Sequence, residues 1–372
     1  MPTENHSHNL LIVSDMHIAE GLLAENGESA YGYEAFLYDG AFARFLRHHE
    51  QMRRNAARRW QERKIARDQG ERIDEEAQRQ DELLKRPWRL VLAGDVFDFW
   101  DIVRVPGNLE VLQEAIKAKQ QELGSQPTAL KWLDTLRQRL DDVDAGRSVD
   151  PWEYDHIRGE LDKLNLTDGP QRRAVEDLTW WAEILVQKPG ARLTRRERRH
   201  GLGTLWQEVV WKLTHVYRGH REFFAALAWF IACGNEVILL KGNHDVELHW
   251  PQVHDGHFPH VLTDVYRDLC GGGAVGPAFD DYPPEMLKGL PDPPSFETLL
   301  PQRFTFEDWF YYERDLVYVE HGNQYEPADS SVYFLAPVMP SDPKRIELPW
   351  GAFMVRYFYN KIIAIHPFAV NV

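Results

Sequence analysis

Aspartate, asparagine and histidine residues follow several short apolar runs of this chain, each at the point where the run ends. The runs have the continuous Val, Ile and Leu composition of strands buried in a parallel sheet, and ligands bind outside the carboxyl ends of such strands. Four runs end in the residues that we select as candidate metal ligands: Asp15, His17, Asp95, Asn243 and His321. Their oxygen and nitrogen atoms would suit a pair of divalent cations at one edge of the sheet.

The first two segments supply carboxylates and one imidazole. Asp15 and His17 are two positions apart at the end of the run LLIVSDMH, so strand periodicity places both on the same side. A Gly-Asp pair follows the second run, and its Asp95 is the best candidate to bridge two metals, because a carboxylate can give one oxygen to each. Asp98 adds a carboxylate near the same edge, and we expect it to be a supporting or structural residue.

The tetrapeptide Gly242–Asp245 (GNHD) is the most specific of these segments. Gly242 allows close approach of the backbone, and Asn243 offers a neutral carbonyl oxygen. His244 is placed to give or take a proton, and we expect Asp245 to orient its ring. We therefore select His244 and Asp245 as candidate catalytic residues. Taken alone, the tetrapeptide is equally compatible with a polar turn after a buried strand.

Composition limits the class of protein. The chain has 372 residues, enough for one large domain or two, and 43% of them are hydrophobic. The net charge of −15 argues against a general grip on nucleic-acid backbone, so nucleic acid is not an expected partner. With two cysteines, a disulfide framework is not indicated and cysteine-based zinc sites are excluded. We find no signal peptide and no membrane span, which predicts a cytoplasmic protein.

Helical patterns fill most of the remaining sequence. A long stretch with apolar residues at three- and four-residue spacing predicts an inserted helical cap, because core connections are normally short. The expected parts are residues 1–104 as the first part of the core, with charged helices over 44–86, residues 105–218 as the cap, and residues 219–372 as the second part of the core. Within them we expect a helix over Arg195–Leu213, a loop or lid over Asp280–Pro301, a hairpin over Trp309–Val319 and helix from Trp350 to Val372.

Four motifs in this order resemble the calcineurin-like metallophosphoesterase superfamily. The matching segments are Asp15-Met16-His17, Gly94-Asp95, Gly242–Asp245 and His321-Gly322. The segment GDVFDFW, which begins at Gly94, is most similar to the branch that contains UDP-2,3-diacylglucosamine pyrophosphatase. The resemblance covers the core strands. It implies an α/β fold with two packed mixed β-sheets flanked by helices, here with a large helical insertion.

The resemblance also implies two ligand sets that share Asp95. The other ligands would be Asp15 and His17 for the first cation, and Asn243 and His321 for the second. His244 would be the general acid or transition-state donor, supported by Asp245. Since the chemistry-bearing segments offer no thiolate, Mn²⁺ is our first choice of metal, with Fe and Zn²⁺ as alternatives.

These features predict a hydrolase of a phosphate monoester, diester or pyrophosphate bond. A hydroxide that bridges the two cations would attack phosphorus in line, and His244 would stabilise or protonate the leaving oxygen. The expected substrate is a phosphorylated small molecule or another phosphoester. The helical insertion is a candidate surface for a protein partner.

The superfamily pattern ends in a Gly-His-x-His motif, and no such motif follows His321. The one later histidine, His366, lies in an apolar segment and is not an expected ligand. Our interpretation is that the chain is truncated at its C-terminus, and the alternative is an incomplete site.

Two other functions stay open. One is a catalytically degenerate binding or regulatory module, in which the candidate metal ligands at the sheet edge would have only a structural role. The missing last motif favours this function, and the intact GNHD opposes it. A nuclease would share the chemistry but needs a basic groove. The basic segments Arg44–Arg67 and Arg192–Arg199 are not interleaved with stacking aromatic residues in an obvious way.

Overall fold

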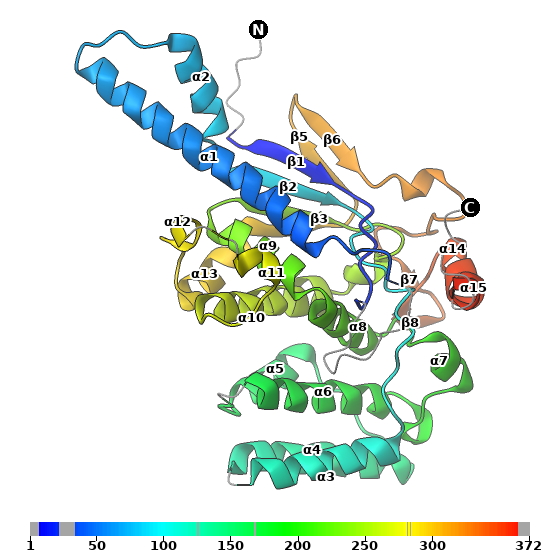
Figure 1. Cartoon of the computed structure of the whole chain (residues 1–372). Coiled ribbons are helices and arrows are strands. Elements are labelled where there is room, and N and C mark those ends of the chain that lie inside the picture. Colours follow the sequence, from blue (N-terminus) through cyan, green and yellow to red (C-terminus); the bar gives the residue numbers. More distant parts are fainter. Residues whose placement is uncertain are drawn as a thin grey trace.

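The fold is built on a parallel sheet of four strands in the order β1-β2-β3-β4 (Figure 1). The computed structural model describes residues 7–21, 34–124, 126–166, 169–280, 282 and 284–363. The four strands are β1 (Asn9–Val13), β2 (Trp88–Ala93), β3 (Glu236–Leu240) and β4 (Phe304–Glu307). Helices occur in every connection between them, as parallel neighbours require a crossover.

The helices are distributed unevenly among these connections. The first connection contains α1 (Asp39–Asp68) and α2 (Glu75–Leu84). The second contains α3 (Leu109–Leu123), α4 (Pro127–Asp144), α5 (Tyr154–Asp162), α6 (Gly169–Val186), α7 (Arg195–His200), α8 (Trp206–Gly219) and α9 (Arg221–Ala232). The third contains α10 (Phe258–Cys270), α11 (Pro277–Asp280), α12 (Pro284–Leu287) and α13 (Pro293–Arg303).

Smaller elements follow β4. They are the antiparallel hairpin β5 (Phe310–Glu313) and β6 (Val317–Glu320), the strand pair β7 (Val338–Met339) and β8 (Asp342–Ile346), and the short helices α14 (Trp350–Met354) and α15 (Asn360–Ile363). The hairpin expected over Trp309–Val319 is therefore confirmed. No described helix is both long enough and apolar enough to cross a membrane.

Alternate residues of the central strands face two different layers. Leu90, Leu92, Val237 and Leu239 belong to the main apolar core beside the helices. Val91, Ala93, Ile238 and Leu240 pack with Tyr311 and Val319 of the hairpin. Figure 1 shows α9 and α10 on one side of the sheet and the β5–β6 hairpin on the other.

The expected α/β architecture is confirmed in its coarse form. The four-stranded sheet is wholly parallel and not mixed. Within the described residues, the layer that covers its second face is a two-stranded hairpin, so the expected pair of packed mixed sheets is not observed there.

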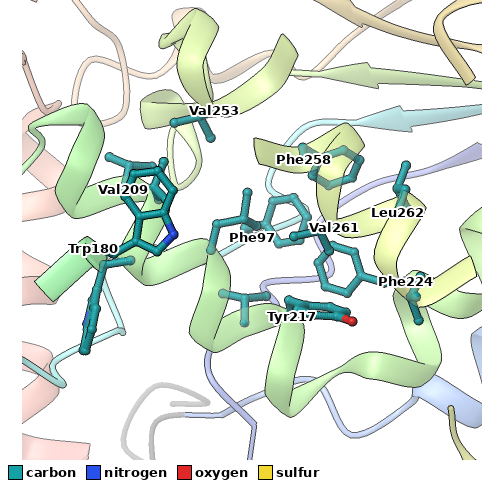
Figure 2. Close-up of a cluster of buried hydrophobic side chains, with 14 of the residues drawn as sticks. Phe97, Trp180, Val209, Tyr217, Phe224, Val253, Phe258, Val261 and Leu262 are labelled. Carbon is teal, nitrogen blue, oxygen red and sulfur yellow. The ribbon is translucent and has the colours of Figure 1, made fainter. Parts of the chain in front are cut away.

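One continuous cluster of buried apolar side chains connects the helices with each other (Figure 2). It crosses both boundaries predicted for the inserted cap. Figure 2 labels members from the loop after β2, from α6, α8, α9 and α10, and from the turn before α10: Phe97, Trp180, Val209, Tyr217, Phe224, Val253, Phe258, Val261 and Leu262.

Two expected elements differ in the structure. The helix expected over Arg195–Leu213 is divided into α7 and α8 at Gly201, whose φ is 82°. A Cβ atom there would lie 2.6 Å from the carbonyl oxygen of Ile102, so the close backbone contact requires glycine. The loop expected over Asp280–Pro301 contains most of α13. Asp292 caps this helix through the N–H of Ser295, and prolines occupy its first turn.

The strand that leads to His321 is also placed differently from the prediction. It is β6 of the antiparallel hairpin, and the fourth parallel strand is β4. The helix expected from Trp350 is present as α14 and α15, but residues 364–372, with His366, lie outside the described residues.

Candidate metal centre

The segments that follow β1 and β2 run side by side beyond the sheet. The N–H of His17 donates to the carbonyl of Asp95 at 3.0 Å, and the N–H of Ile18 donates to Val96 at 2.9 Å. Asp15, His17 and Asp95 have φ angles of 54°, 49° and 49°. This left-handed conformation costs a residue with a Cβ about 1–2 kcal/mol. Strained backbone of this kind is concentrated at functional sites.

Two glycines make room for Asp95 and His321. Asp95 is buried, and its Oδ1 accepts the backbone N–H of His244 at 2.8 Å. A Cβ at Gly242 would collide with that oxygen. A Cβ at Gly94 would lie 2.6 Å from the ring of His321. Both positions therefore require glycine, and for Gly242 this agrees with the expected close backbone approach.

His321 and Asn243 converge beside Asp95. Nδ1 of His321 donates its proton to the carbonyl of Ala93 at 3.0 Å. Nε2 then lies 3.0 Å from Oδ1 of Asn243 and 3.3 Å from Oδ2 of Asp95. When the imidazole is neutral, its lone pair is on Nε2, so three acceptor atoms face one another. A bound cation would satisfy all three, and the contact with Ala93 holds the ring in the required tautomer.

One carboxylate oxygen of Asp98 lies beside two imidazoles. Oδ2 of Asp98 is 2.7 Å from Nδ1 of His244 and 3.4 Å from Nδ1 of His17. Because these Nδ1 atoms face Asp98, the Nε2 atoms of both rings remain available to bind a ligand. Trp100 stacks on His244 with 4.1 Å between the ring centroids, which restricts the plane of the imidazole.

Asp245 supports the backbone and not the ring of His244, so the role expected for it is wrong. Its Oδ1 accepts the N–H of Gly242 at 2.7 Å, and its Oδ2 accepts the N–H of Val96 at 2.8 Å. These contacts join the turn after β3 to the segment after β2. Burial, with the neighbouring charge of Asp95, raises the pKa of Asp245 to about 7. The ring of His244 is oriented by Asp98.

The potential ligand atoms form two groups that share Asp95. In each group, one atom of every residue lies within 4.8 Å of the others: His17, Asp95 and His244 in one, and Asp15, Asp95 and His321 in the other. Asp95 is the member common to both groups. The grouping itself differs from the expected one, because His17 lies with His244 and Asp15 lies with His321. Carboxylate, imidazole and amide ligands without sulfur fit hard or borderline divalent cations.

Carboxylates and imidazoles of the centre shift each other's proton affinity. Burial alone would lower the pKa of His244, but the charge of Asp98 raises it to about 10. Burial likewise opposes protonation of His321, and its contact with Asp95 raises the pKa to about 9. Burial would raise the pKa of Asp95 and Asp98, yet the neighbouring histidines hold both below the ordinary value. A cation that binds to Nε2 of His321 must therefore displace a proton from that imidazole.

Two residues near the centre were not assigned a role from the sequence. Trp100 lies within the segment GDVFDFW, and only its stacking on His244 reveals what it does. Asn360 of α15 is buried and donates to the carbonyl of Trp100 at 3.0 Å, which connects α15 to the loop after β2. No local pattern marks Asn360, because its partner is distant in the sequence.

Comparisons with known proteins leave the family open. No model of a protein family matches the chain, and neither the curated proteins nor the solved structures contain a match.

Proposed function

We propose that this protein hydrolyses a phosphate monoester, diester or pyrophosphate bond with two divalent cations held beyond the carboxyl ends of β1, β2 and β3. One observation carries the proposal: the buried carboxylate of Asp95 is shared by two groups of potential ligands. A bridging ligand between two cations is typical of binuclear hydrolases. Together with the resemblance of the four motifs, this supports our proposal that the chain is a calcineurin-like metallophosphoesterase.

The two cations would share Asp95 and divide the remaining ligands. The observed grouping supports Asp15 and His321, with Asn243, for one cation, and His17 for the other. Mn²⁺ is the first choice, and Fe and Zn²⁺ are alternatives. When bound, such cations lower the pKa of a coordinated water and neutralise phosphoryl oxygens.

His244 is the proposed proton donor to the leaving oxygen. Its pKa of about 10 keeps the ring protonated at neutral pH, with the carboxylate of Asp98 as the stabilising partner. Asp98 and Trp100 hold the ring in one orientation, so little reorganisation is needed when a proton is transferred. Asp245 maintains the turn from which His244 projects.

The substitution Asp95→Asn tests the proposal directly. It preserves the shape of the side chain and removes the charge that both ligand groups share. We expect the variant to lose tightly bound metal and hydrolytic activity together. Elemental analysis and assays of chromogenic phosphate mono- and diesters with added Mn²⁺ measure the two properties.

Asp315→Asn is a matched control, because Asp315 lies in the exposed turn between β5 and β6 and its side chain is 63% exposed. This control should keep both metal and activity. A purified wild-type chain that binds no divalent metal and hydrolyses no phosphoester would contradict the proposal. That result would support the alternative of a degenerate binding or regulatory module.

A further inference from the structure

A second set of polar side chains lines a cavity between α6, α8 and α10. The cavity has a volume of about 220 Å³. Its polar lining includes Arg172, Arg173 and Glu176 from α6, Tyr217 from α8, and Asp264 from α10. None of the residues assigned to the candidate metal centre lines it.

The acidic residues of the cavity already have cationic partners. The pairs are Glu176 with Arg158 at 2.8 Å, Asp264 with His260 at 2.9 Å, and Asp268 with Arg221 at 2.5 Å. These carboxylates therefore do not leave the cavity with an uncompensated negative charge.

Glu176, His260 and Asp264 are close enough together to hold a metal ion, but their hydrogen bonds favour another arrangement. The guanidinium of Arg158 donates to Nδ1 of His260 at 3.1 Å. The proton of a neutral His260 is then on Nε2, which lies 2.9 Å from an oxygen of Asp264. Since Nε2 is the atom that a cation would need, this cluster is better explained as an ion network.

Several hydrogen-bond donors at the cavity have no acceptor among the described residues. Arg173 forms no ion pair or hydrogen bond within the described part of the chain. The hydroxyl of Tyr217 likewise has no hydrogen-bond partner there, although the residue is only 8% exposed. Nε of Arg172 is buried without a hydrogen bond, although it forms an ion pair with Glu176 at 3.6 Å. Because the unpaired groups are donors, a complementary ligand must supply acceptors and negative charge.

The charges around Asp264 support the inference that the ligand of this cavity is negatively charged. Burial would raise the pKa of Asp264, but His260, Arg172 and Arg158 hold it well below the ordinary value. The surroundings therefore favour negative charge. The volume of about 220 Å³ is below the roughly 300–1,000 Å³ of pockets that hold drug-sized ligands, so the fitting ligand is small.

We propose that this cavity binds a small anion with a carboxylate or phosphate group, through Arg173 and Tyr217, with the charge of Arg172 beside them. The anion would lie between a helix of the expected cap, α6, and a helix of the expected core, α10. Its binding would therefore stabilise the packing of these helices on each other. This site does not depend on the proposed hydrolase function.

Calorimetric titration of the full chain with inorganic phosphate, and separately with succinate, tests the proposal and distinguishes the two sources of negative charge. We expect saturable binding of at least one anion, accompanied by a higher midpoint of thermal unfolding. Arg173→Gln should weaken that binding roughly tenfold or more, since it removes a charged hydrogen bond. Tyr217→Phe keeps the packed ring and should weaken binding roughly fivefold.

Arg314→Gln is the matched control, because it makes the same change of charge at a side chain that is 85% exposed on the β5–β6 turn. This variant should bind like the wild type. The titration is repeated in Asp95→Asn, because phosphate could also bind at the metal centre, and binding in the cavity should survive that change. No binding at millimolar anion, equal affinity in wild type and Arg173→Gln, or loss of binding in Asp95→Asn would each overturn the proposal.

Discussion

At the scale of single residues, Asp98 has a larger role in the candidate metal centre than its position in the sequence indicates, because it contacts two imidazoles. One of its oxygens lies beside Nδ1 of both His17 and His244. A carboxylate in this position fixes the tautomer and the orientation of an imidazole and increases its basicity. Asp98 thus supports a proposed ligand and the proposed proton donor at the same time.

Asp98→Asn should weaken metal binding about 10- to 100-fold, the usual effect of losing a partner of a metal-binding histidine. Titration of the metal-free protein with Mn²⁺ measures the change. The exposed substitution Asp315→Asn should leave the affinity unaltered. Unchanged affinity in Asp98→Asn would mean that neither imidazole next to Asp98 is a ligand.

His244→Ala separates proton transfer from metal binding. If His244 donates a proton, turnover should fall about 10²- to 10⁴-fold while the metal content stays close to normal. Assays of turnover and elemental analysis on the same preparation measure both. Loss of metal from this variant would instead make His244 a ligand, as its position near His17 and Asp95 allows.

Gly242→Ala should disturb the candidate metal centre by a steric clash alone. The added Cβ would collide with Oδ1 of Asp95, and overpacking of this kind typically costs about 1–3 kcal/mol of unfolding free energy. Metal affinity should fall with it. Gly159→Ala is the control, because a Cβ at this position in α5 has open space around it. Chemical denaturation of both variants tests the comparison, and equal stabilities would contradict it.

At the scale of elements, His220 connects the beginnings of α1 and α9. It precedes α9 and is buried, with Nδ1 3.0 Å from a carboxylate oxygen of Asp39 in the first turn of α1. Its Nε2 is 3.0 Å from Oε2 of Glu34. Burial disfavours the charged ring, but these two carboxylates raise the pKa of His220 from the ordinary 6.5 to about 9.

This shift predicts how stability depends on pH. Because the pKa is higher in the folded state, the stabilisation is complete below pH 6.5 and is lost as the pH rises through about 9. Its upper limit is about 3 kcal/mol, from 1.4 kcal/mol for each pKa unit. Urea denaturation over this range, with wild type and His220→Gln compared, measures it. The difference between them should shrink toward alkaline pH, and a constant difference would contradict the assignment.

At the scale of the whole molecule, the helical insertion and the sheet-bearing part share one apolar core. Trp180 of α6 shows this, because its ring lies 5.7 Å from Tyr154, 6.3 Å from Trp206 and 6.0 Å from His257, measured between centroids. A shared core predicts that the two parts unfold together.

Trp180→Ala should therefore lower the stability of the whole chain and not of the insertion alone. The expected loss is about 3–5 kcal/mol, as for other large buried aromatic residues. Far-UV circular dichroism and tryptophan fluorescence should show coincident unfolding curves in the wild type and in the variant. An early transition confined to part of the helical signal would contradict the prediction and indicate a separately folding cap.

The sequence by itself determined where chemistry could occur. Strands β1, β2 and β3 were expected from continuous apolar runs, and residues just beyond a strand must lie at its end. Asp15, Asp95 and Asn243 were selected on this basis, and their side chains do lie around one centre. Local composition carries this information because it decides which short segments are buried as strands.

Only the tertiary structure decided how these groups are connected. His321 reaches Asp95 from an antiparallel hairpin, and Asp98 orients His244 while Asp245 bonds to backbone. Left-handed φ angles at Asp15, His17 and Asp95 determine where these side chains point, and contacts across the sheet edge maintain them. The direction of a side chain beyond a strand end depends on partners that are distant in the chain. The spacing of residues along the sequence therefore does not predict that direction.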